Sequence, residues 1–518
     1  MISYQNNQLK QVKSQPYIDT TAKHIGEFIR TMRENRGITQ EEFAKLLNTS
    51  QSAVARMENG GQNFTAKILQ EISQVLGRKI ISLIPSVDFE VVGGKKLHGS
   101  IKTNTSKNGA MGLFCAALLN KGKTILHNIP RIEEVNRLLE IFQSIGVQSK
   151  WLGKNTIELV MPAKFSLDNL DADSASKIRS GLMIIGALTH FQSEFRLPHS
   201  GGCKMGERTI SAHRFALEKM GIKIKTEKDN YRVTAKRIHP AEIVLYEQSD
   251  TAAENVLLAA ALTPGKTILK FAPANYQVQE VANFLQQCGV KIEGIGTHIM
   301  TIEGVKEINQ NIEYYNSEDP IDTMMLLSAA IVTNSELEIT RCPIDFLELE
   351  LLKLEKMGLK YERSEVYLAQ NSWTKLVDLK IFPSKLVASH DKIHAQPYPG
   401  INIDNLPFFV PIATQAEGQT LIHDWTWENR AIYFTELNRL GADITLADPH
   451  RAFVQGPTKL KAAQVVCPPA LRPAVIILIA MLAAEGKSIL RNVYSIMRGY
   501  EEVAERLNSI GADIKVLS

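Results

Sequence analysis

Apolar residues cluster into runs longer than a helical turn through most of the chain. The longest run, residues 473–484, carries no charged side chain. It is well short of the roughly 20 residues that a bilayer-spanning helix needs, so we interpret it as a helix buried in a folded core. Residues 255–262 show the same apolar pattern. The pattern therefore predicts a soluble protein with several fully buried helices.

A helix end, a glycine and a strand-like segment recur six times. The recurring glycines, 68 to 83 residues apart, are Gly146, Gly221, Gly289, Gly358, Gly441 and Gly511. Glycine at such a junction commonly adopts the left-handed C-cap conformation. The period is too long for a solenoid, whose repeats run to about 20–50 residues. We therefore expect six α/β units, three per globular lobe, with a ligand cleft between two lobes.

The first part of the chain has a different pattern, and residues 22–85 predict several short helices. Thr39 and Glu42 have the spacing of a capping box, and Ser50 is a good N-cap for a helix over residues 51–58. Two short helices joined by a tight turn form a helix-turn-helix. In the helix before them, Arg33 is expected on the polar face.

The second helix of that pair has the side chains of a DNA-reading helix. Small Ser52 would let the helix enter a major groove, where Gln51 and Arg56 could reach bases or phosphates. Gln40 could donate to a phosphate. The segment resembles the phage-repressor-like (Cro/C1, Xre) DNA-binding family, which implies double-stranded DNA as a partner and a possible homodimer. The alternative is a helical bundle that binds protein instead.

Charge and cysteine usage narrow the function classes. The chain has 518 residues and a net charge of +4, and the first 85 residues, with eleven basic and seven acidic side chains, account for all of it. A basic module ahead of a neutral one suggests two different partners. The five cysteines form no Cys-x-x-Cys pair, so neither a disulfide framework nor a metal site is expected. The polar N-terminus lacks a signal-peptide core, which predicts a cytoplasmic protein.

One glycine-rich segment, residues 197–208, lacks apolar periodicity and should be a loop. It contains Cys203, whose thiolate form the nearby Lys204 and Arg208 would favour. An incidental loop cysteine is the alternative. Lys107 and Asn108 lie between a strand and an apolar helix, where lysines often meet anions.

Further charged residues lie at predicted junctions between strands and helices. They are Arg179, Arg430, Arg472, Arg498 and Asp404. Surface arginines are common, and Asp404 could equally serve as a helix N-cap. Their role therefore depends on whether the fold brings them together.

Taken together, these segments resemble the enolpyruvyl transferases, and specifically the UDP-N-acetylglucosamine 1-carboxyvinyltransferase family of peptidoglycan synthesis. The motifs that carry the resemblance are Ser106-Lys-Asn108, Gly-Gly-Cys203-x-x-Gly-x-Arg208, Thr251-Ala-Ala-Glu-Asn255, Pro399-Gly-x-x-x-Asp404, Glu428-Asn-Arg430 and Arg498-Gly-Tyr-Glu501. The resemblance implies an α/β fold of two inside-out barrels, each of three βαβαββ units, after the all-α helix-turn-helix domain. Lobe I would comprise residues 87–105 and 318–518, and lobe II residues 106–317.

The resemblance also implies a reaction: the enolpyruvyl group of phosphoenolpyruvate passes to the sugar 3′-hydroxyl and phosphate leaves, without metal or cofactor. Cys203 would be the acid and Asp404 the acceptor of the hydroxyl proton. The anion-binding residues would be Lys107, Arg208 and Arg498, supported by Arg430 and Arg472, with Asn108 and Arg179 on the sugar side.

The chain departs from the family pattern near the acceptor. Ala470 replaces a usual Asp, Thr209 and Ser211 replace a usual Pro and Asp, and Asp250 brings a carboxylate into the nucleotide-binding turn. The acceptor could therefore be another nucleotide or sugar. The alternative function is a transcriptional regulator whose enzyme-like part senses a cell-wall precursor without turnover.

Overall fold

The structure is a computed structural model that describes residues 20–34, 38–61, 64–75, 87–199, 201 and 209–517. The chain divides into two compact units, residues 1–85 and 86–518. In the described residues, no helix is long and apolar enough to cross a membrane. Two predicted site residues, Cys203 and Arg208, lie outside the described residues.

The first unit is the predicted helical domain. Its helices are α1 (Thr20–Glu34), α2 (Gln40–Leu46), α3 (Gln51–Glu58) and α4 (Ala66–Val75). The capping box of Thr39 and Glu42 and the Ser50 cap of α3 are both present, as predicted. Apolar side chains from the helices, such as Ile29, Phe43 and Val54, form its core.

The prediction for Arg33 was wrong. Its side chain is buried rather than on the polar face, and Nε and Nη2 donate to Glu58 across 2.5 and 3.0 Å. The packing of α1 against α3 provides the reason, because α3 places a buried carboxylate where the guanidinium can reach it. The pair ties α1 to the helix predicted to read DNA.

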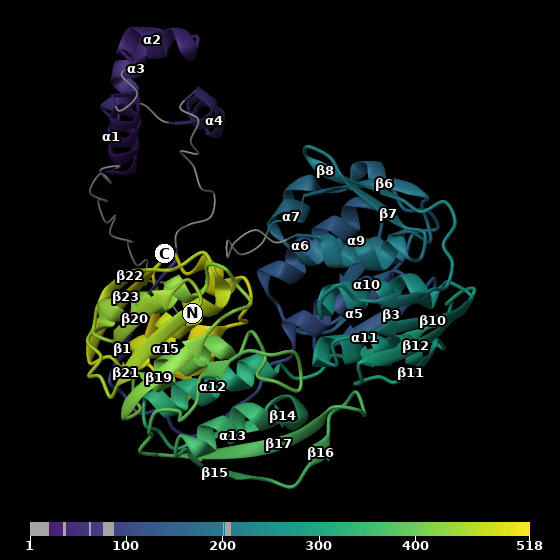
Figure 1. The fold of residues 1–518 in the computed structure, drawn as a ribbon. Coiled ribbons are helices and arrows are strands. Elements are labelled where there is room, and N and C mark those ends of the chain that lie inside the picture. Colours follow the sequence, from purple (N-terminus) through teal and green to yellow (C-terminus); the bar gives the residue numbers. More distant parts are fainter. Residues whose placement is uncertain are drawn as a thin grey trace, which may run out of the picture. The chain divides into compact units, whose positions relative to one another are not determined.

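The second unit contains six small sheets (Figure 1). Three belong to what we call lobe I: β22-β23-β1-β24, β15-β17-β14-β2 and β18-β19-β21-β20. Their strands are β1 (Asp88–Gly93), β2 (Ser100–Lys102), β14 (Leu337–Pro343), β15 (Lys360–Arg363), β16 (Tyr367–Leu368), β17 (Lys375–Phe382), β18 (Ile393–His394), β19 (Gly418–His423), β20 (Asp443–Asp448), β21 (Arg451–Gly456), β22 (Gln464–Val466), β23 (Gly486–Arg491) and β24 (Ile514–Leu517). The short strand β16 pairs with β17.

The other three sheets form what we call lobe II: β13-β3-β5-β4, β11-β12-β10-β9 and β6-β8-β7. Their strands are β3 (Thr124–His127), β4 (Gln148–Trp151), β5 (Ile157–Val160), β6 (Glu194–Pro198), β7 (Lys223–Thr226), β8 (Asn230–Thr234), β9 (Glu242–Val244), β10 (Gly265–Lys270), β11 (Lys291–Glu293), β12 (Ile299–Gly304) and β13 (Ile312–Tyr315).

The sheets share one topology. In five of them a central strand has a parallel neighbour on one side and two antiparallel strands on the other; β19, for example, pairs in parallel with β18 and antiparallel with β21. All six repeat glycines have positive φ, between 87° and 104°. This confirms the six α/β units, because the same left-handed turn links helix to strand in each.

Helices lie inside each set of sheets. The buried helices are α5 (Lys107–Ala117), α8 (Ile184–Leu188) and α10 (Asp250–Ala261) in lobe II, and α12 (Pro320–Val332), α14 (Phe409–Ala413) and α15 (Leu471–Ala483) in lobe I. Each lobe has its own hydrophobic core, and α12 packs on α15 in one while α8 packs on α10 in the other. The predicted buried helix over residues 473–484 is thus confirmed within α15.

Shorter or more amphipathic helices complete the units. They are α6 (Glu133–Ser144), α7 (Ala172–Lys177), α9 (Ser211–Glu218), α11 (Tyr276–Gln287), α13 (Glu348–Lys356), α16 (Tyr494–Met497) and α17 (Val503–Asn508), with 3₁₀ turns η1 (Leu167–Asn169), η2 (Ser180–Met183), η3 (Ile344–Phe346), η4 (Leu406–Phe408) and η5 (Ala431–Leu440).

Candidate active site

Lys107 is the first residue of α5, whose N-cap is Ser106. Its ammonium group lies 2.6 Å from Oε2 of Glu134, in the first turn of α6. Arg498, which follows α16, approaches the other oxygen of the same carboxylate at 3.3 Å. Glu134 belongs to lobe II and Arg498 to lobe I, so this three-residue cluster joins the lobes.

Charge compensation explains how Glu134 stays ionised while buried. Burial acts to raise the pKa of the Glu134 carboxyl, but Lys107 and Arg498 outweigh burial and hold the pKa below its ordinary value. A carboxylate shared by two cations fixes both side chains in one orientation. The two cations therefore lie close together at the junction of the lobes, where a small anion could meet both.

Asp404 lies in the turn that precedes η4, and its side chain faces arginines. Oδ2 accepts from Nη2 of Arg472 across 3.2 Å, and Oδ1 is 3.8 Å from Nη1 of Arg430. Burial acts to raise the pKa of the Asp404 carboxyl, but Arg472, then Arg430, outweigh it and lower the pKa. Asp404 is thus held in its ionised form, and its side chain faces the two arginines instead of capping a helix as its position also suggested.

Arg472 is buried in the first turn of α15, where it also donates from Nη1 to the Tyr500 hydroxyl across 2.7 Å. A third carboxyl, that of Asp319 at the N-cap of α12, interacts electrostatically with Arg472. Burial raises the pKa of Asp319 to about 6 despite the arginine. Unlike Glu134 and Asp404, this carboxyl therefore has a pKa above its ordinary value.

Arg430 is fully buried and has its own partners. Its guanidinium forms two hydrogen bonds to Asp424, at 2.5 and 2.9 Å, and one to the carbonyl of Ile403 at 2.8 Å. Ile403 immediately precedes Asp404. The arginine therefore holds the turn that carries Asp404 through Nε and Nη2, while Nη1 has no hydrogen-bond partner among the described residues.

The predicted sugar-side residues lie in lobe II. Asn108 donates to the buried Tyr276 hydroxyl across 3.0 Å. Arg179 donates from Nη2 to the carbonyl of Thr209 across 3.0 Å. Burial lowers the pKa of Arg179, while Tyr231 and Glu247 act in the opposite direction. Arg179 thus lies directly beside the end of the segment 202–208, whose structure is not described.

Asp250 begins α10 and accepts a hydrogen bond from Asn275 across 2.9 Å. Burial raises the pKa of the Asp250 carboxyl to about 6, with a further contribution from Asp404 in the other lobe. Glu254, one turn later, is fully buried with no hydrogen-bond partner for either carboxyl oxygen among the described residues. Burial raises the pKa of Glu254 well above its ordinary value.

A cavity of about 710 Å³ is lined by both lobes, with residues that are close in sequence to Asp250 and Asp404. Gln248 and Phe271 contribute from lobe II, and Tyr398 and Gly400 contribute from the chain just before Asp404 in lobe I. Such volumes are typical of small-molecule sites between domains.

The four described cysteines are buried, unlike the predicted environment of Cys203. Burial raises the pKa of Cys288, Cys342 and Cys467 to about 12, and that of Cys115 further still. These thiols stay protonated and are inert. Among the described residues, no group of histidines, cysteines and carboxylates could hold a metal ion.

In the helical domain, Gln51, Ser52 and Arg56 are exposed along α3. Gln40 is different, because its side-chain nitrogen donates to Oε2 of Glu58 across 2.8 Å. A phosphate would have to compete with that hydrogen bond.

Sequence reasoning missed several residues of the site. Three carboxylates that interact with the cations of the site do not stand out in the sequence. They are Glu134 (with Lys107 and Arg498), Asp319 (with Arg472) and Asp424 (with Arg430). Only Asp319 carried a usable signal, since an Asp-Pro pair before a long apolar run marks a helix start.

Two family descriptions match the chain. Residues 91–507 match EPSP synthase (3-phosphoshikimate 1-carboxyvinyltransferase), and residues 29–83 match a helix-turn-helix family. The UDP-N-acetylglucosamine 1-carboxyvinyltransferase of Bradyrhizobium diazoefficiens is 34% identical over 83% of this chain and 98% of its own length. The Treponema denticola protein of that name is 35% identical, over 83% and 99% respectively.

Solved structures agree on the fold. The enolpyruvyl transferase NikO from Streptomyces tendae has a TM-score of 0.72 at 24% identity, covering 83% of this chain and 99% of its own. An EPSP synthase from Acinetobacter baumannii has a TM-score of 0.64 at 18% identity, covering 83% and 100%. The predicted two-lobed α/β architecture is thereby confirmed.

Proposed function

Because the chain belongs to the EPSP synthase family of enolpyruvyl transferases, with a helix-turn-helix domain in front, we propose a specific reaction for it. The enolpyruvyl group of phosphoenolpyruvate is transferred to the 3′-hydroxyl of UDP-N-acetylglucosamine, or of a related acceptor, and inorganic phosphate is released. The observation that carries this proposal is the cluster of Lys107, Arg498 and Arg472 beside the ionised Asp404.

The donor carries a phosphate and a carboxylate, so it needs several cations in one place. Lys107 and Arg498 meet at Glu134, and Arg472 adds a guanidinium from lobe I. Arg208 joins them as a further phosphate ligand. Fixed cations stabilise the charge of the leaving phosphate without reorganising during the reaction.

The transfer requires three proton movements. Cys203 gives its proton to the methylene carbon of the donor, while the acceptor oxygen bonds to the neighbouring carbon and its proton passes to Asp404. The bond from that carbon to the phosphate oxygen then breaks, and the new methyl group loses a proton to the Cys203 thiolate. The proton on Asp404 leaves with the inorganic phosphate, which restores both groups. Arg430 acts on this step as a positioning residue, through the turn that carries Asp404.

The acceptor lies toward lobe II, with Asn108 and Arg179 as its contacts. Asp250 argues for an acceptor other than a standard diphosphate, because its carboxylate occupies the first turn of α10, where helix amides would otherwise attract a phosphate. The lobe boundaries after residues 105 and 317 belong to this proposal, and the two separate hydrophobic cores support them.

A second candidate is a sensor that binds these ligands without turnover. Ala470 favours it, since this fully buried residue at the N-cap of α15 supplies no side-chain hydrogen bond next to Arg472. In either case, we propose that the helix-turn-helix domain binds double-stranded DNA, as a dimer that places two copies of α3 in adjacent half-sites.

Phosphate release from phosphoenolpyruvate, measured on the full chain with UDP-N-acetylglucosamine and with other hydroxyl-bearing nucleotides, tests the reaction. The proposal predicts release that depends on an acceptor and is lost in Cys203→Ala. Binding of both ligands with no release above the Cys203→Ala background would favour the sensor instead.

A further inference from the structure

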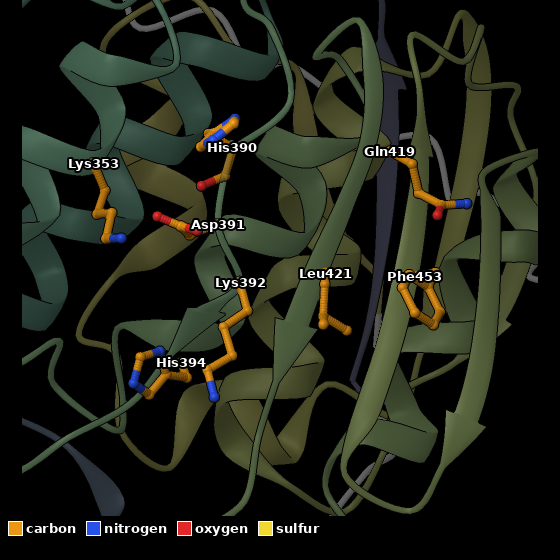
Figure 2. A pocket seen from close by; sticks show the side chains of 9 residues that line it. Lys353, His390, Asp391, Lys392, His394, Gln419, Leu421 and Phe453 are labelled. Atoms are coloured by element: carbon orange, nitrogen blue, oxygen red, sulfur yellow. The ribbon is translucent and has the colours of Figure 1, made fainter.

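A second cavity, of about 600 Å³, lies in lobe I and is lined by residues that the proposed reaction does not use (Figure 2). Its walls come from α13, from residues 389–394 at β18, and from strands β19 and β21. The volume is within the range of about 300–1,000 Å³ that is usual for small-molecule sites.

Strand register places basic side chains in one row across three strands. His394 of β18 lies opposite His423 of β19, which in turn lies opposite Arg451 of β21. Lys392, two residues before His394, lines the cavity together with it. Ile393, between these two, points into the core on the other face.

An apolar row runs parallel to the basic one. Leu421 of β19 lies opposite Phe453 of β21, two residues along each strand from His423 and Arg451. Both side chains line the cavity. Lys392 lines the same cavity as Leu421. A cation and an aromatic ring therefore line one cavity, and Figure 2 shows Leu421 and Phe453 on adjacent strands.

The lysines of this cavity are not neutralised. Lys353 of α13 and Lys392 form no salt bridge with any described residue. Burial, then Lys392 and Lys353, lower the pKa of His394, so both lysines act on the same small region. Among the described residues that line the cavity, Asp391 alone carries a carboxylate.

We propose that this cavity binds an organic phosphate that carries a ring, such as a nucleotide. Lys353 and Lys392, which both act on the region around His394, bind the phosphate, because flexible ammonium groups suit a compact anion. Phe453 and Leu421 contact the ring, which a simple inorganic anion would leave unused. The site is separate from the cleft at Asp404, and it does not depend on the proposed reaction.

Calorimetric titration of the full chain with AMP, adenosine and inorganic phosphate tests the proposal. The variant Lys353→Gln/Lys392→Gln should weaken AMP binding at least about fivefold, as expected for the loss of two partly solvated charge contacts. Phe453→Ala should weaken AMP binding but leave inorganic phosphate binding unchanged. The matched control is Lys356→Gln/Lys385→Gln, which removes two lysines of the same lobe that do not line the cavity.

Phosphoenolpyruvate affinity reports on the fold and on the other site, and should be the same in every variant. Equal AMP affinity in the Lys353→Gln/Lys392→Gln variant and its control would overturn the proposal. So would AMP binding no tighter than inorganic phosphate binding, or no AMP binding by the unaltered chain at millimolar concentration.

Discussion

Arg472 and Asp404 lie 68 residues apart in the sequence, yet Nη2 of the arginine donates to Oδ2 of the aspartate across 3.2 Å. The first residue is in the opening turn of α15 and the second is in the turn before η4. The contact makes the charge of the proposed base depend on the arginine that also faces the donor. A substitution of either Arg472 or Asp404 should therefore impair the function of both residues.

The variant Arg472→Lys tests that dependence. The guanidinium group of Arg472 donates to Tyr500 from one nitrogen and to Asp404 from another, and the single nitrogen of a lysine cannot reproduce this geometry. The value of kcat should therefore fall about tenfold to a hundredfold. Because Arg472 lowers the pKa of Asp404, its loss raises that pKa and the acid limb of the pH–rate profile moves to higher pH. Arg506→Lys, at another arginine that holds a carboxylate in lobe I, should leave that limb in place.

Glu134→Gln removes the shared partner of Lys107 and Arg498. Two cations would then lie close together without compensation, and the free energy of unfolding should fall by about 2–4 kcal/mol. The KM for phosphoenolpyruvate should change more than kcat, since Glu134 orients the cations and touches no reacting atom. Glu133→Gln is the control, because this half-buried residue of the same turn pairs with Arg137 and not with Lys107 or Arg498, and equal effects in both variants would contradict the assignment.

Asp250→Asn should stabilise the protein only above acidic pH. A carboxyl whose pKa rises from its ordinary value to about 6 on folding costs no stability below the unfolded pKa, and the cost grows until the folded pKa is passed. The variant should therefore match the unaltered chain near pH 4 and gain about 1–2 kcal/mol at pH 8. Calorimetric Tm values measured across this pH range test the prediction, with the exposed Asp168→Asn as the control. A difference in Tm between the Asp250→Asn variant and the unaltered chain that does not change with pH would contradict it.

The double variant Gln51→Ala/Arg56→Ala should weaken binding to the operator about tenfold or more, and lower the salt slope by about one ion. Both side chains are exposed on α3, so the fold should be unaffected. Glu71→Ala on α4 is the control. Fluorescence anisotropy at several salt concentrations measures both quantities, and no change in either would remove α3 from the DNA interface.

Repetition made the fold predictable from the sequence. Each unit ends its helix with a glycine that must adopt positive φ, and the apolar run of α15 contains too few polar residues for any exposed position. Capping boxes are equally local, which is why Thr39 and Ser50 were placed correctly. Local signals of this kind need no knowledge of what packs against them.

Partners across the fold were not predictable in the same way. The burial of Arg33 depends on Glu58, a helix away, and the role of Glu134 depends on Arg498, which lies in the other lobe. Nothing in the spacing of Arg430 indicated that Asp424 and the Ile403 carbonyl would bind its Nε and Nη2. Such pairings follow from tertiary contacts that no residue spacing encodes.

Isolation of the reaction product tests the central claim most directly. The full chain is incubated with phosphoenolpyruvate and UDP-N-acetylglucosamine. The released phosphate is quantified, and the nucleotide sugar is analysed by mass spectrometry. The account predicts an enolpyruvyl ether of the acceptor and phosphate in equal amounts, with neither formed by Cys203→Ala or Asp404→Asn. Phosphate without any ether on this or a related acceptor, or an ether formed equally well by both variants, would contradict it.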